Sequence, residues 1–480
     1  MQFNSWIFIG IFLPVVLVSF YMIGKTRFRQ YSVFIIILGS LIFYGYANIA
    51  YLFYFMICIF INYLLLKNLL EKHKKSIFVL GLTMNIGALA ILKYTNFFIT
   101  SLNSIFKSDY NLIKLFIPLG LSFFTFQFIA LLYDAYKGKI TSVDFKKYLL
   151  FTTYFPKITQ GPITLYQDFE QNLKDDSYMN FNAENFAKGL YLFTMGFGKK
   201  ILIADNLAVF VNSGFNDGYL SYNSTMTLIL VLSYTLQIYF DFSGYSDIAK
   251  GISMLFNIEL PQNFNSPYKA ISVNSFWKRW HMSLTNFFTK YLYIPLGGNR
   301  KGEVRTYLNT LIIFTVSGLW HGPNYTFIVW GVMHGIACVL EKKYSDKLEN
   351  INIVIRWLYT FAFINVAWIF FRSNSLHQAL QIIKNILVCD FSGVDFWKIS
   401  QIALPELGTL ISLLNITILN ERFNLIYLVL LVLIIIQSKN SDEKAARFKP
   451  DMAHVFFSII VLTLCILHFG SKITFIYEMF

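Results

Sequence analysis

The sequence predicts an all-α integral membrane protein, and three observations lead to that fold class. Apolar residues make up 56% of the 480-residue chain and aromatic residues 19%, whereas only 14% are charged. Soluble domains carry roughly one-quarter charged residues, so this composition is unlike theirs. Uninterrupted apolar segments recur from end to end, and basic residues gather in every second loop between them. Together these features indicate one helical membrane domain over residues 1–480.

Eleven apolar segments account for the expected helices. The first of them lacks a basic leader and a small-residue cleavage site, so it is predicted to be a retained helix and not a signal peptide. Most segments approach the roughly 20 residues that a helix needs to cross the hydrocarbon. We therefore expect about eleven transmembrane helices, at residues 3–24, 31–47, 49–66, 77–93, 113–135, 224–246, 307–322, 324–340, 353–371, 421–437 and 452–470.

Basic residues predict the orientation of these helices. Loops 25–30, 67–76 and 136–147 are rich in lysine and arginine, which places them in the cytoplasm by the positive-inside rule. Loop 94–111 and the N-terminus are then expected outside. The last span, within residues 450–480, follows another basic loop, so the C-terminus is also expected outside. The net charge of +14 therefore indicates membrane orientation and no nucleic-acid partner.

The middle third is expected to depart from simple spanning helices because it carries more charge and proline. In "YFPKITQGPI", residues 154–163, two prolines bracket Gly161, which predicts a re-entrant turn or a surface loop. Residues 274–302 place aromatic side chains at helical spacing after Asn274 and Ser275, which are candidate N-caps. This pattern predicts a helix lying in the membrane interface.

A titratable side chain stands out in "SGLWHGPNYTFIVWGVMHG", residues 317–335. An ionisable residue at membrane depth is costly and normally faces a cavity or a partner, although a hydrogen-bonded core histidine is the alternative. Gly318 and Gly322 allow close approach of backbone or ligand, and Pro323 ends the helix beside His321. Burial would keep this imidazole neutral, which is the form that a general base requires.

Other constellations predict less chemistry. His334 lies between Gly331 and Gly335, a spacing typical of helix packing. No metal site is predicted, because the histidines lack carboxylates or a cysteine pair at ligand spacing. In "YFDFSGYSDIAKG", Asp241 and Asp247 are equally compatible with structural ion pairs and with a site. The four scattered cysteines are expected to be packing thiols.

Six stretches between residues 117 and 380 resemble the membrane-bound O-acyltransferase (MBOAT) family, in its bacterial branch of alginate and peptidoglycan O-acetyltransferase-like proteins. The resemblance implies a funnel of transmembrane helices with re-entrant and interfacial helices, in the cytoplasmic membrane of a bacterium. The stretches are "IPLGLSFFTFQFIALLYDAYKG", "YFPKITQGPI", "DFSGYSDIAKG", "NFNSPYKAISVNSFWKRWHMSLTNFFTKYLYIPLGGNRKG", "GLWHGPNYTFIVWGVMHG" and "NVAWIFFRSNSLHQAL".

The resemblance also implies roles for individual residues. His321, in "GLWHG", corresponds to the catalytic histidine at the bottom of the funnel, and His281, in "RWHMSL", to a second site histidine. The family's small active-site asparagine or aspartate has no unambiguous match, so Asn274 and Asp241 are both candidates.

The acyl donor implied by the resemblance is acetyl-CoA, a substrate delivered from the cytoplasm, and no permanently bound cofactor is expected. Trp320 is a candidate for the donor site beside the catalytic histidine. Lys278 and Arg279 are candidates for attracting the phosphates of the coenzyme, although positive-inside anchoring to membrane lipids explains them equally well.

The acyl group is expected to leave outside the membrane, to a polysaccharide or peptidoglycan, with the help of a separate extracytoplasmic SGNH-type acetyltransferase. The chain ends in "FIYEMF", which resembles a Phe-x-Tyr-x-x-Phe hexamer found in surface-polymer acylation systems. That likeness makes Tyr477 a candidate acyl carrier, with interfacial anchoring as the alternative.

Three other functions stay open at the level of sequence. The first is D-alanyl transfer from a carrier-protein thioester to teichoic acid. The second is a proton-linked transporter, which also uses buried histidines and broken helices, although no inverted repeat is apparent. The third is a scaffold that recruits extracytoplasmic enzymes and for which His321 is dispensable.

Overall fold

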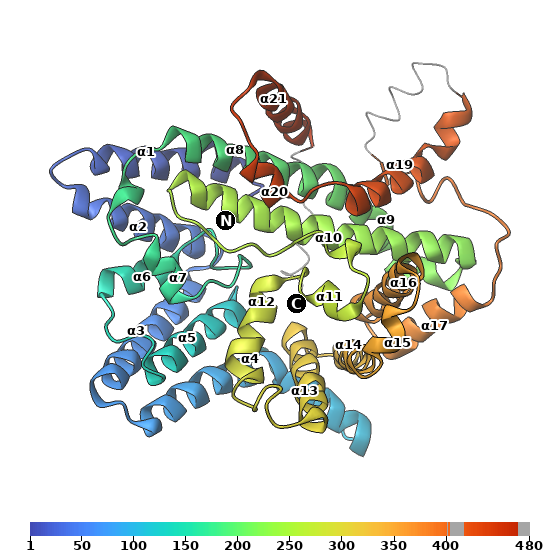
Figure 1. The fold of residues 1–480 in the computed structure, drawn as a ribbon, viewed down its shortest axis with the longest axis horizontal. Helices are drawn as coiled ribbons and strands as arrows, with labels where there is room; N and C mark the ends of the chain where they lie inside the picture. The colour runs from blue at the N-terminus through green and yellow to red at the C-terminus, as the bar shows by residue number, and fades with distance from the viewer. Residues whose placement is uncertain (401, 404–416, 469–480) are drawn as a thin grey trace. The chain divides into compact units, whose positions relative to one another are not determined.

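The computed structural model describes residues 1–400, 402–403 and 417–468, and over these residues the chain is helical without β-strands (Figure 1). It divides into two compact units. The first comprises residues 1–193, 246–261 and 448–455, and the second comprises residues 194–245, 262–447 and 456–480. Helices α8, α10 and α21 each contribute residues to both units. The absence of β-strands from the described residues confirms the expected all-α class.

The first unit contains the N-terminal helices, and two of them present most of their apolar surface outward. Only 22% of the apolar window of α3 and 11% of that of α4 is buried, as expected for helices that face hydrocarbon. The helices of this unit are α1 (Leu13–Gly24), α2 (Ser32–Gly45), α3 (Ile49–Lys72), α4 (Lys75–Phe106), α5 (Leu121–Tyr136), α6 (Phe145–Thr153), α7 (Tyr166–Gln171) and most of α8 (Ala183–Phe197).

Helix α4 continues through much of the predicted loop 94–111, so that part of the prediction was wrong. The hydroxyl groups of Thr95 and Ser101 each donate to the carbonyl oxygen four residues earlier, at 2.6 and 2.7 Å. Polar side chains in this stretch therefore bond to their own helix and do not end it. The helix stops only at Phe106, before Lys107 in the left-handed conformation.

Residues 154–163 form a non-helical segment that is buried throughout, so of the two predicted forms the surface loop is wrong. The ammonium group of Lys157 lies 3.7 Å from the centre of the Phe151 ring and donates to Oε1 of Gln127 at 3.1 Å. Gly161 is required here, because a Cβ atom would clash with the Lys157 backbone. The segment is therefore held inside the first unit.

The second unit contains the remaining helices and both histidines of the predicted site. Asn324 caps α14 by accepting from the amide of Thr326 at 3.1 Å, and Asn352 caps α16 in the same way. The helices are α9 (Asp205–Asn216), α10 (Ser224–Leu255) in its first part, α11 (Val273–Trp277), α12 (Met282–Phe288), α13 (Glu303–His321), α14 (Tyr325–Lys343), α15 (Ser345–Glu349), α16 (Ile353–Arg372), α17 (Leu376–Leu387), α19 (Thr417–Gln437), α20 (Ser441–Ala446) and α21 (Met452–Leu467).

Helices α13 and α14 pack closely along each other through glycine. A Cβ atom on Gly318 would clash with the carbonyl oxygen of Phe327, and one on Gly331 would clash with that of Phe314. Gly335 also faces α13, at Leu311. The predicted helix-packing role of the glycines around His334 is thereby confirmed.

The predicted interfacial helix over residues 274–302 is wrong. The segment is broken into α11, α12 and a π-helical turn at Thr289–Tyr293, because His281 takes a left-handed conformation with φ +43°. Its N-cap is Ser272, whose side chain accepts from the amide of Ser275, and neither Asn274 nor Ser275 is the cap. Most of the aromatic stripe is buried in protein, including Phe276 and Trp280.

Each of the eleven predicted apolar segments contains a helix among the described residues. Four of these helices are long and apolar enough to cross a membrane, at Ile49–Lys72, Lys75–Phe106, Ser224–Leu255 and Ile353–Arg372, and five more are shorter apolar helices. The chain is thus a multi-pass membrane protein, while the number of about eleven spans stays a prediction.

Candidate active site

His321 is the last residue of α13, and the chain turns sharply after it. Gly322 is extended, and Pro323 has no amide hydrogen with which to continue the helix. The imidazole is only 4% exposed, and its ring centre lies 5.2 Å from that of Trp330 and 5.1 Å from that of Phe371. Both contacts are edge-on. His321 therefore occupies an aromatic environment at a helix end, as predicted.

His281 lies at the break between α11 and α12 and is fully buried. Its Nδ1 atom is 3.3 Å from Oδ1 of Asn263, and the same oxygen accepts from the Ser283 hydroxyl at 2.6 Å. Burial lowers the pKa of His281 from 6.5 to about 3, so the imidazole is neutral at pH 7. The sequence did not point to Asn263 as a site residue, because a single asparagine in the irregular segment "NFNSPYKA" has no local signature.

Trp320 brings the two predicted histidines into one group. Its ring centre is 4.9 Å from that of His321 and 6.4 Å from that of His281. We call His281, Trp320, His321, Trp330 and Phe371 the histidine site. It combines two imidazoles with an apolar wall, an arrangement suited to removing a proton from a neutral hydroxyl where water is scarce.

His334 is adjacent to this group, and its place agrees with a packing role. Trp330 lies between the imidazoles of His334 and His321, with its ring centre 5.0 Å from the first and 5.2 Å from the second. The indole nitrogen of Trp277 donates to Nδ1 of His334 at 3.1 Å. This bond from α11 fixes the orientation of the His334 ring on α14.

Asp241, a candidate for the small acidic site residue, lies in a buried ionic group. The ammonium of Lys200 is 2.7 Å from a carboxylate oxygen of Asp241 and 2.8 Å from one of Asp205, and all three side chains are almost fully buried. Burial lowers the pKa of Lys200, but the two aspartates more than offset this and raise it overall. Burial raises the pKa of Asp205 to about 7, against the opposing effect of Lys200. We call these three residues the lysine–aspartate cluster.

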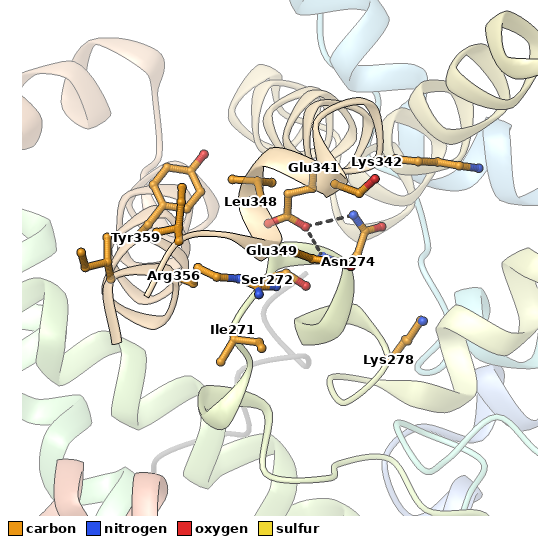
Figure 2. Close-up of a pocket in the computed structure, with 13 residues that line it drawn as sticks. Ile271, Ser272, Asn274, Lys278, Glu341, Lys342, Leu348, Glu349, Arg356 and Tyr359 are labelled. Carbon is orange, nitrogen blue, oxygen red and sulfur yellow. Dashed lines mark hydrogen bonds between the residues drawn. The ribbon is translucent and has the colours of Figure 1, made fainter. Parts of the chain in front are cut away.

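Asn274 and Lys278 line a different feature, a cavity of about 610 Å³ whose lining includes neither His281 nor His321 (Figure 2). The Asn274 side chain donates to a carboxylate oxygen of Glu341 at 2.9 Å and to the carbonyl of Cys338 at 3.1 Å. Arg279 donates to the carbonyl oxygen of Asn265 at 3.3 Å.

The last candidate, Tyr477, lies outside the described residues, so the structure does not bear on its role. The four cysteines differ from the expected packing role in part: Cys338 and Cys465 are buried, Cys58 is half-buried and Cys389 is exposed.

Comparison with known proteins matches residues 47–377 to the membrane-bound O-acyltransferase family, MBOAT. The peptidoglycan O-acetyltransferase of Helicobacter pylori is 37% identical over 433 residues, which cover 83% of this chain and 82% of that protein. A probable alginate O-acetylase, AlgI, of Pseudomonas putida is 32% identical over 442 residues, covering 88% and 87%. The teichoic acid D-alanyltransferase of Bacillus subtilis is more distant, at 26% identity over 54% of this chain and 70% of its own length.

Proposed function

Because the chain belongs to the membrane-bound O-acyltransferase family and is therefore an O-acyltransferase, we propose that it moves an acetyl group from cytoplasmic acetyl-CoA across the membrane, for O-acetylation of peptidoglycan or another extracytoplasmic polysaccharide. One observation carries this proposal: His321 and His281 flank Trp320 in a buried aromatic site. Family membership makes the chain an enzyme, and this supports acyl transfer over the transporter and scaffold interpretations.

In the proposed reaction His321 is the general base. Its imidazole removes the proton from an incoming hydroxyl, the oxygen attacks the thioester carbonyl, and the carbon–sulfur bond breaks as the ester bond forms. The proton then passes from the imidazolium to the leaving thiolate of the coenzyme. General base catalysis of this kind contributes roughly 10²- to 10⁴-fold to the rate, and positioning in a dry site contributes more.

His281 is proposed as the second site histidine, and Asn263 as the residue that positions it. The Asn263 carboxamide oxygen lies 3.3 Å from the His281 ring nitrogen and also binds the Ser283 hydroxyl. Trp320, between the two imidazoles, forms the proposed wall for the acyl donor. Of the two earlier candidates for the small polar residue, Asn274 is bonded to Glu341 and Asp241 to Lys200.

The donor is proposed to enter from the cytoplasm, where Lys278 and Arg279 attract its phosphates. About eleven spans then form a funnel with His321 at its bottom, in the inner membrane of a bacterium with both chain termini outside. This arrangement gives one imidazole access to a thioester on one side and to a hydroxyl on the other.

On the outer side, we propose Tyr477 as the acyl carrier and an SGNH-type acetyltransferase as the partner that completes the transfer to the polymer. A phenol has a pKa near 10, so its ester keeps much of the transfer potential of the thioester. An acetyl-histidine is the rival intermediate. Rapid quenching with labelled acetyl-CoA, followed by mass spectrometry of peptides containing His321 and Tyr477, separates the two.

The whole reaction is tested in cells by the amount of O-acetyl on the surface polymer. His321→Ala should abolish the modification while the protein stays folded in the membrane. His377, an exposed histidine at the start of α17, provides a matched control, and His377→Ala should leave acetylation unchanged. Substantial polymer acetylation in the His321→Ala strain contradicts the proposed role.

A second candidate function rests on the more distant similarity to a teichoic acid D-alanyltransferase. In that case the donor is a carrier-protein thioester, and the transferred group is D-alanine. Cells supplied with labelled D-alanine and labelled acetate distinguish the two donors: the acetyl proposal predicts that only the acetate label depends on His321.

A further inference from the structure

The cavity of about 610 Å³ lies within the second unit, between the start of α11, the end of α14, α15 and the start of α16 (Figure 2). Its lining includes three cationic side chains, those of Lys278, Lys342 and Arg356, and two carboxylates, those of Glu341 and Glu349. A cavity of this size can hold a small ligand.

One of the two carboxylates is already bound by protein. Glu341 accepts hydrogen bonds from the amides of Val273 and Asn274, at 2.6 and 2.9 Å, and from the Asn274 side chain. Its charge is therefore compensated by the α11 backbone.

Two of the three cations, Arg356 and Lys342, are not compensated in this way. Within the part of the chain that the structure describes, the guanidinium of Arg356 and the ammonium of Lys342 have no ion-pair or hydrogen-bond partner. Arg356 is half-buried in the first turn of α16, where the helix dipole adds positive potential, and Figure 2 shows its side chain directed toward Ser272. Three cations then face one carboxylate that the backbone does not hold, that of Glu349, so the cavity favours an anion, and arginine suits phosphate in particular.

An apolar wall continues from the cavity onto the surface of α16. Ile355 and Tyr359 line the cavity and are 58% and 55% exposed, and Leu358 beside them is 53% exposed. Helix α16 is one of the four helices that are long and apolar enough to cross a membrane. A ligand in the cavity thus meets cationic side chains at one end and an apolar protein surface at the other. Basic pockets at such places bind lipid head groups.

We propose that this cavity is a binding site for an anionic phospholipid, with the phosphate at Arg356 and Lys342 and the acyl chains along the exposed side of α16. The proposal goes beyond acyl transfer and stands independently of it. The apolar wall favours a lipid over a soluble phosphate, because a free nucleotide or inorganic ion gains nothing from isoleucine side chains.

Lipid binding is measured by native mass spectrometry of the purified full-length protein, with phosphatidylglycerol as the probe and phosphatidylcholine as the reference. Arg356→Gln should weaken phosphatidylglycerol binding at least about tenfold, because an arginine–phosphate contact is lost. Lys342→Gln should weaken it by a smaller factor. Lys347→Gln is the matched control, since Lys347 lies on α15 but does not line the cavity, and it should bind as the parent protein does.

A second pair of variants tests the acyl chains. Ile355→Ser should weaken binding several-fold, whereas Val354→Ser should not, because Val354 is equally exposed at 57% but does not line the cavity. Equal binding by Arg356→Gln, Lys342→Gln and Lys347→Gln overturns the proposal. Because Lys278, which is proposed to attract the donor's phosphates, also lines the cavity, the lipid proposal is overturned if coenzyme A or inorganic phosphate displaces the lipid in an Arg356-dependent manner.

Discussion

The histidine site and the lysine–aspartate cluster are both buried polar groups in the second unit, but they are built differently. In the cluster, Lys200 lies within 2.8 Å of two carboxyl groups, so its charge is paired inside the protein. In the histidine site, the neighbours of His321 are aromatic rings, and His281 is held by a neutral carboxamide.

This difference indicates a structural role for the lysine–aspartate cluster and a chemical role for the histidine site. A charge that is paired inside a protein holds its partners in place, and its removal leaves the opposite charge buried and uncompensated. Replacing an imidazole among apolar rings leaves no opposite charge uncompensated, and the imidazole can exchange a proton with a substrate. We therefore expect changes to the cluster to act on stability and changes to the histidine site to act on turnover.

The largest expected effect on stability is that of Lys200→Met. Two buried carboxylates would remain without their cation, which costs about 3 to 5 kcal/mol of unfolding free energy. Thermal unfolding in nanodiscs measures this. Adding Asp205→Asn and Asp241→Asn to the same protein should recover much of the loss. Failure of the triple variant to regain stability would show that the cluster does more than balance charge.

His281→Gln should lower acetyl transfer by about 10- to 100-fold, because loss of the second imidazole disturbs the geometry of the reacting groups. Its unfolding temperature at pH 7.5 should stay near that of the parent protein. Asn263→Ala should show a smaller loss of the same kind, since it releases the His281 ring. A loss of folding without loss of rate per folded molecule would place His281 with the structural group.

Gly318→Ala tests the contact that positions α13 and its terminal histidine. The added methyl group would clash with the Phe327 carbonyl, which should cost about 1 to 3 kcal/mol and also lower the transfer rate. Gly10→Ala is the control, because its Cβ atom would have open space around it. Equal unfolding temperatures for the two variants would show that α13 and α14 can separate freely.

The smallest expected change per step of the measurement, about 1.4 kcal/mol for one pH unit, is in the pH dependence of stability. Burial lowers the pKa of His281 to about 3, below its unfolded value near 6.5. The unfolded state therefore binds a proton below pH 6.5 that the folded state does not bind. Above pH 6.5 the protonation of His281 does not affect the free energy of unfolding. Between pH 6.5 and about 3, this free energy falls by about 1.4 kcal/mol for each unit by which the pH drops. The dependence should be weaker in His281→Gln.

Much of the fold follows from sequence, because hydrophobic length is a local property. All eleven predicted apolar segments contain helices, and the glycines around His334 pack as expected. The errors arose where a local pattern was overridden. Aromatic spacing in residues 274–302 suggested one helix, but the left-handed backbone of His281 divides it. In α4, side-chain bonds to the preceding turn carry the helix past residues that suggested a loop.

The candidate site was only partly predictable. The sequence around His321 marked a buried imidazole at a helix end, whereas the pairing with His281 was implied by family resemblance, since the two residues are 40 positions apart. The Lys200 partner of Asp241 is also remote in sequence, at a separation of 41 residues. Asn263 was missed because a single asparagine in an irregular segment has no local signature.

The most direct test is a single-turnover measurement of labelled acetyl transfer from acetyl-CoA by purified His321→Ala in nanodiscs, with thermal unfolding recorded on the same sample. We predict that transfer falls by about 10²- to 10⁴-fold while the unfolding transition stays where it is in the parent protein. Transfer within about tenfold of the parent by the folded variant would contradict the account, because this is a barrier change of only about 1.4 kcal/mol.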